Sequence, residues 1–216
     1  MIPRRPPLPL RALAGVFNGL AWLTRGYALP FTAELLRSYG VRGVADRTAA
    51  LERFSVLIEE RLGERDGHML LGFGALWNGC YVCALGHIYA GNLAHFRDRG
   101  ELHPLDETEL ATLLRTGTDA ELLAYAERCL AAPGDARLLG LVRRLYVIKR
   151  DGQDDGVDAE PGDTEMIAGA VAIYDFINLC TIYGEGETPP LIAFSRLNRD
   201  RRLRARYAAA RQAARR

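Results

Sequence analysis

Apolar residues recur every three or four positions along most of the chain, which is the spacing of helices that bury one face. Residues 46–63 show it well, with Asp46 as the expected N-cap and Gly63 as the expected end. No run alternates for long enough to predict a strand. We therefore expect an all-α fold. The same pattern predicts further helices over residues 10–23, 31–39, 68–77, 80–96, 106–117, 119–131, 136–150, 164–184 and 196–216.

Length and composition favour one domain. The chain has 216 residues, of which 49% are hydrophobic, so a sizeable core can form. We expect a single helical domain over residues 1–216, with its core at about residues 30–195. An acidic loop is expected at residues 151–165, and a basic, alanine-rich helix at residues 196–216 is expected to end the chain.

The charge of the chain does not indicate a particular binding partner. The formal net charge is +1, and of the 28 basic residues only Lys149 is a lysine, so arginine clusters carry little functional weight. The segment 196–216 has Tyr207 as its only aromatic residue, without the interleaved aromatics of many nucleic-acid binders. We expect a solvated terminal helix and no nucleic-acid partner. The acidic loop 151–165 has the opposite charge and is a candidate contact for that helix.

The beginning of the chain resembles neither a membrane span nor a secretory signal. The apolar run that follows Arg11 is too short to cross a bilayer, and no clear small-residue cleavage site follows it. Four cysteines at irregular spacing do not make a disulfide framework in a chain of this size. We expect a cytoplasmic protein without a membrane partner.

The strongest candidate chemistry lies in the stretch WNGCYVCALGHIYAG, residues 77–91. In a helix capped by Asn78, the side chains of Cys80, Cys83 and His87 would face the same way. Cys80 would lie in the first turn, where unpaired N–H groups and the helix dipole stabilise a thiolate. His87, one turn past Cys83, could take its proton. A lowered thiol pKa, a second thiol and a base are what peroxide reduction by cysteine needs.

Two structural interpretations compete with redox chemistry. Free cysteines are often buried as small apolar residues, so Cys80 and Cys83 could belong to the core. With His68 and His87 they also form a set of two thiolates and two imidazoles, which suits Zn²⁺. A C-x-x-C at the start of a helix fits redox chemistry better than the turn typical of structural zinc. A c-type haem is excluded because Ala84, and not a histidine, follows Cys83.

Residues 68–94 resemble the signature of the alkylhydroperoxidase D-like branch of the carboxymuconolactone decarboxylase family: a helix, a break at Asn78, then C-x-x-C-x-x-x-H opening the next helix. The resemblance implies an all-helical bundle that forms homo-oligomers. It implies reduction of a hydroperoxide substrate, with an external dithiol as reductant and no bound cofactor. Because the C-x-x-C opens a helix, we expect no bound metal. Cys83 would attack the peroxide, Cys80 would be the resolving and more exposed thiol, and His87 would relay protons.

The chain departs from that family pattern at the relay carboxylate. The family usually has a glutamate twelve residues before the first cysteine, where this chain has His68. The position between the cysteines that is often a histidine is Val82. Because histidine accepts protons near neutral pH, we expect His68 to replace the glutamate, with Glu64 one turn earlier as a second candidate. Two alternatives stay open: a peroxidase activity that is weak or lost without the glutamate, and a His68 that faces solvent at a helix start.

Two other functions stay open. The founding branch of the family suggests a decarboxylase or isomerase acting on a small cyclic substrate, although that branch does not need the C-x-x-C. A helical protein without enzymatic activity, with structural or zinc-bound thiols, is the other.

The remaining cysteines and histidines are expected to be structural. Cys129 and Cys180 are expected in the core, His95 at an interface on the face of His87, and His103 in a turn.

Overall fold

The computed structural model of the protein describes residues 7–29, 31–153, 160–171 and 191–215. Every regular element in these ranges is a helix, so the expected all-α class is confirmed for this part of the chain. Within the same ranges, no helix combines the length and the apolar character that crossing a membrane requires.

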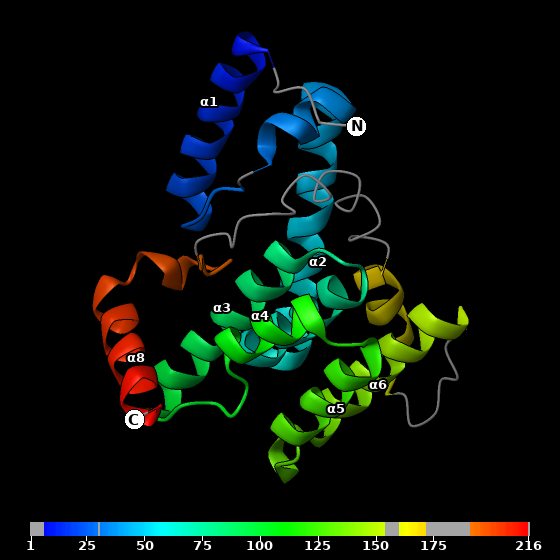
Figure 1. Ribbon diagram of the computed structural model, residues 1–216. Coiled ribbons are helices and arrows are strands. Elements are labelled where there is room, and N and C mark those ends of the chain that lie inside the picture. The colour runs from blue at the N-terminus through cyan, green and yellow to red at the C-terminus, as the bar shows by residue number, and fades with distance from the viewer. Residues whose placement is uncertain (1–6, 30, 154–159, 172–190, 216) are drawn as a thin grey trace.

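Most helices follow the predicted segments. The single helix expected at residues 196–216 is wrong, because a short 3-10 helix at residues 196–199 ends at Asp200, whose side chain caps a separate α-helix that starts at Arg201. Figure 1 shows α1 beside the first half of α2 at one end of the molecule, with α8 and the α5–α6 pair on opposite sides of the other end. Residues 163–171 are helical, and the rest of the helix expected at 164–184 lies outside the described residues. The elements in chain order are α1 (Leu8–Arg25), α2 (Thr32–Trp77), α3 (Tyr81–Arg99), α4 (Glu107–Thr116), α5 (Asp119–Cys129), the short η1 (Pro133–Asp135), α6 (Ala136–Asp151), η3 (Arg196–Arg199) and α8 (Arg201–Ala214).

Helix α2 is interrupted twice by glycines. Gly40 and Gly63 have φ values of 67° and 80°, a region that L side chains rarely adopt, so the helix bends at both positions. The break at Gly63 is where the sequence predicts it. The start predicted at Asp46 is wrong, because Asp46 lies inside the helical piece that follows Gly40.

The turn between α2 and α3 also differs from the expectation. Asn78 is the C-cap of α2, and the positive φ of Gly79, 75°, lets the amide of Cys80 donate to the carbonyl of Ala75 at 2.9 Å. Cys80 is therefore the N-cap of α3, and Asn78 does not cap that helix. The sequence Asn-Gly fits both roles, and the hydrogen bonds of the turn decide between them.

The second half of α2 and the whole of α3 form the centre of the fold. Glycines let these two helices come close together: a Cβ on Gly72 of α2 would lie 2.7 Å from Ile88 Cδ1, and one on Gly91 of α3 would lie 3.1 Å from Met69. Every residue of α3 from Cys83 to Phe96 is buried. Side chains that face α2 from α3 are consequently held at short and fixed distances.

The basic C-terminal helix packs on the start of α4. The buried carboxylate of Glu107 accepts hydrogen bonds from the Tyr207 hydroxyl at 2.6 Å and the Asn92 amide at 2.7 Å. Arg215 pairs with Asp106 at 2.7 Å. Among the described residues of the acidic loop, the candidate contact with this helix is not seen within the chain, and Asp163 binds Arg137 of α6 instead.

Candidate active site

Cys80 and Cys83 are joined by a disulfide, with their Cα atoms 5.4 Å apart. Cys80 caps α3 and Cys83 lies in its first turn, so the helix start alone brings the two sulfurs together. The expectation that Cys80 is the more exposed thiol is wrong, since Cys80 is 0% and Cys83 2% exposed. The residues on either side of Cys80 in the sequence, Gly79 and Tyr81, are both exposed at the α2–α3 turn.

His87 lies one helical turn beyond Cys83 and faces His68 of α2. The Nδ1 atoms of the two histidines are 3.1 Å apart, which is a hydrogen bond in which one Nδ1 carries the proton and the other accepts it. Phe194 lies edge-on against the His87 ring at 5.3 Å and restricts its orientation. The two candidate histidines thus form one buried pair, although they are 19 positions apart in the chain.

Burial keeps both imidazoles neutral at physiological pH. It lowers the pKa of His68 to about 4. Burial also lowers the pKa of His87 well below its ordinary value, and the charge that His68 would carry adds to this effect. A neutral imidazole can accept a proton from a neighbouring thiol.

The carboxylate beside this pair is Glu59, which sequence reasoning missed. Its Oε1 lies 3.8 Å from His68 Nε2, on the side of the ring away from His87. The break at Gly63 folds the preceding helical piece against the following one, so that a Cβ on Gly67 would lie 3.4 Å from Glu59. The sequence feature that could have indicated this contact is Gly63, because a helix break between Glu59 and His68 lets the two flanking pieces fold toward each other.

Glu64, the carboxylate candidate from the sequence, is turned toward another partner. It pairs with Arg97 of α3 at 2.6 Å. Desolvation raises the pKa of Glu59, and the negative charge of Glu64 adds to the rise. At 3.8 Å from His68 Nε2, the Glu59 carboxylate suits a group that stabilises positive charge on that imidazole without taking the proton itself.

Both histidines line a pocket of about 730 Å³. Glu59 and Glu64 form part of its wall, and Phe194 lies beside the His87 ring. Neither Cys80 nor Cys83 is part of the lining. The other lining residues are Arg25, Tyr27, Leu51, Glu52, Arg53, Ser55, Val56, Ser195 and Arg196.

The remaining candidates lie away from this site. His95 packs against His103 with ring centroids 5.1 Å apart, and His103 accepts the Leu105 amide at 3.1 Å, as a turn residue does. Cys129 is buried, as expected, and Cys180 lies outside the described residues. Val82 is half-buried. In the part of the chain that the structure describes, no three or more histidine, cysteine, aspartate or glutamate side chains are grouped to hold a metal ion.

Comparison with protein-family models, curated proteins and solved structures finds no match for this chain. The family resemblance rests on residues 68–94 alone.

Proposed function

We propose that the chain is a thiol-dependent hydroperoxide reductase that uses Cys80 and Cys83 as its redox centre. The observation that carries the proposal is the cysteine pair at the start of α3, one turn from a histidine that is hydrogen-bonded to a second histidine and, through it, close to a carboxylate. A pair of thiols supplies two electrons, and a chain of proton-accepting groups leads from them to a pocket.

The reaction starts from the reduced dithiol. The Cys83 thiolate attacks one oxygen of the hydroperoxide, the O–O bond breaks, and the products are a Cys83 sulfenic acid and an alcohol. The Cys80 thiol then attacks the sulfenic sulfur, a disulfide forms, and water leaves. One hydroperoxide and two thiols thus give one alcohol, one water and the disulfide.

The histidine pair handles the protons of these steps. His87 accepts the Cys83 thiol proton, and the Nδ1–Nδ1 hydrogen bond lets the charge spread to His68, where Glu59 stabilises it. The proton then returns to the departing alkoxide. His68 therefore takes the place of the family's glutamate, and Glu59 supplies the negative charge from further away.

An external dithiol closes the cycle by thiol–disulfide exchange. Its approach is expected at the α2–α3 turn, because Gly79 and Tyr81 are the exposed residues on either side of Cys80. We carry over from the resemblance the assembly into homo-oligomers.

Mass spectrometry of the reduced protein, before and after one equivalent of tert-butyl hydroperoxide, tests this function. We expect the loss of two hydrogens and of two thiols, mapped to Cys80 and Cys83, with Cys129 unchanged. A zinc assay on the same sample distinguishes this function from the alternative in which the thiols are structural and bind zinc. Stoichiometric zinc with unreactive thiols, or no reaction without metal, would overturn the proposal.

A further inference from the structure

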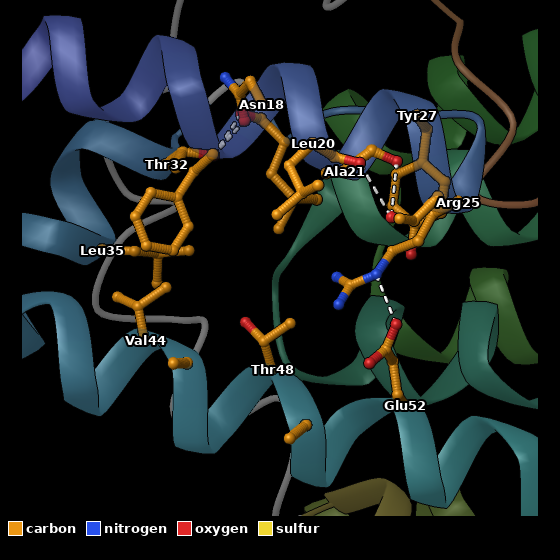
Figure 2. A pocket seen from close by; sticks show the side chains of 15 residues that line it. Asn18, Leu20, Ala21, Arg25, Tyr27, Thr32, Leu35, Val44, Thr48 and Glu52 are labelled. Carbon is orange, nitrogen blue, oxygen red and sulfur yellow. Dashed lines mark hydrogen bonds and ion pairs between the residues drawn. The ribbon is translucent and has the colours of Figure 1, made fainter.

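A second pocket, of about 230 Å³, lies between α1 and the first half of α2 (Figure 2). Its walls are mostly apolar, and its far end is closed by a hydrogen bond of 2.6 Å from the Thr32 hydroxyl to Asn18 Oδ1. Leu20 forms part of the rim and is 60% exposed, so the pocket is open to solvent on that side. The apolar lining residues are Phe17, Leu20, Ala21, Leu29, Leu35, Val44, Ala45 and Ala49.

The end opposite Thr32 carries a cation. Arg25, the last residue of α1, donates from Nε to Glu52 Oε1 at 2.7 Å, and its side chain is only 23% exposed. Figure 2 shows its two terminal nitrogens directed into the space between the helices, on the side of Thr48. Glu52 thus fixes the guanidinium through one nitrogen and leaves its forked end toward the pocket.

An arginine fork held in this way matches the two oxygens of a carboxylate. The apolar walls match a hydrocarbon chain, which gains free energy by leaving water. At the roughly 30 Å³ that one water occupies in the liquid, the space has the volume of about eight waters, so it suits a short chain such as that of hexanoate. A phosphate or a peptide would leave polar groups unpaired along the apolar walls.

We infer that this pocket binds a monocarboxylate with a short unbranched apolar chain, its carboxylate on Arg25 and its chain running between α1 and α2 toward Thr32. The site is distinct from the histidine pair and does not depend on the redox function. It shares three wall residues with the larger pocket, Arg25, Tyr27 and Glu52, so the two spaces are neighbours.

Calorimetric titration of the full chain with hexanoate, 1-hexanol and acetate tests the site. We expect hexanoate to bind at least about tenfold more tightly than either of the others, because only it has both the charge and the chain. Equal binding of hexanoate and 1-hexanol would overturn the role of Arg25. Equal binding of hexanoate and acetate would overturn the role of the apolar walls.

Matched variants locate the ligand. Arg25→Gln and Glu52→Gln both break the same ion pair, but only Arg25→Gln removes the cation. We expect hexanoate to bind about tenfold more weakly to Arg25→Gln and at least as tightly to Glu52→Gln. Ala45→Phe, at an exposed position of the pocket wall, is expected to block binding without loss of fold, as judged by circular dichroism. Unchanged affinity in Arg25→Gln or in Ala45→Phe would place the ligand elsewhere and overturn the inference.

Discussion

The molecule contains two pairs of buried histidines that use the same helix in different ways. In the first, His87 of α3 meets His68 of α2, with ring centroids 5.4 Å apart. In the second, two turns further along α3, His95 meets His103 at 5.1 Å. Burial lowers the pKa of all four imidazoles, and it lowers the pKa of both His68 and His103 to about 4.

The two pairs differ in what surrounds them. His68 and His87 share a hydrogen bond, line the larger pocket and lie one turn from the disulfide. His103 is engaged by the backbone amide of Leu105 and lies 3.9 Å from Asp135, which is held by Arg65. A lowered histidine pKa therefore reports burial in both places. The pocket and the neighbouring thiols distinguish the candidate site.

The largest expected effect is on the cysteines of the first region. Cys83→Ser should abolish hydroperoxide reduction, at least about a thousandfold, because it removes the attacking sulfur. Cys80→Ser should stop after the sulfenic acid, which dimedone labelling detects. Cys129→Ser is the matched control and should keep the activity, since Cys129 lies on α5 away from the site. Retained turnover in Cys83→Ser would contradict the proposed chemistry.

The second-largest expected effect is a difference in reaction rate between variants of the two histidine pairs. His87→Gln should slow hydroperoxide reduction by about a hundredfold, in the range for loss of a general base. His103→Gln removes an equally buried imidazole from the other pair and should leave the rate within about threefold. Stopped-flow measurement of sulfenic acid formation gives both rates. Equal losses in the two variants would mean that burial, and not proton transfer, accounts for the effect.

In stability the same two regions should behave alike. The unfolded histidine has a pKa of about 6.5, and folded His68 one of about 4, so between these pH values only the unfolded chain binds the proton. The neutral, buried imidazole therefore contributes its full share to the free energy of unfolding above pH 6.5. That contribution is lost as the pH falls toward 4. For His68 it amounts to about 3 kcal/mol.

Urea unfolding at a series of pH values measures this dependence. His68→Asn and His103→Asn should each flatten the acid slope by a similar amount, because the pKa of each imidazole is lowered to about 4. The slope is compared, and not the absolute stability, since both variants also lose packing. An unchanged slope in either variant would show that its histidine is already protonated or exposed in the folded protein.

The smallest effect is expected at Glu59. Glu59→Gln should lower the rate by about tenfold, less than loss of a group that transfers the proton itself, because the carboxylate acts through His68 at 3.8 Å. The acid limb of the pH–rate profile should shift with it. Glu60→Gln, at the exposed neighbouring position, is the control and should leave the profile unchanged. Identical profiles for both variants would remove Glu59 from the relay.

Much of the fold could be predicted from the periodicity of apolar residues. The helices at residues 106–117, 119–131 and 136–150 have strong local signals, such as the cap at Asp106, which accepts the Thr108 amide at 2.7 Å. The boundaries at Asp46 and Asn78 were predicted wrongly. The position of each boundary depends on the positive φ of a nearby glycine, Gly40 in the first case and Gly79 in the second. Residue propensities alone do not show which of several glycines or caps ends a helix.

The candidate site was predictable only in part. Cys80, Cys83 and His87 lie within one helix, so their spacing shows that they are close. His68 could be connected to them only through the family resemblance, and its ring contact with His87 depends on how α2 packs on α3. Glu59 could not be found this way, because its position depends on the bend at Gly63 and not on any period.

The close approach of α2 and α3 has a consequence for mutational scanning. Gly72 and Gly91 carry no functional group, yet a Cβ at either position would crowd Ile88 or Met69, so atoms at the contact between the two helices would have to shift. A shift of about 1 Å at a proton-transfer distance is enough to cost a large factor in rate. In a saturation library selected for activity, these glycines should therefore tolerate as few substitutions as the histidines whose spacing they set.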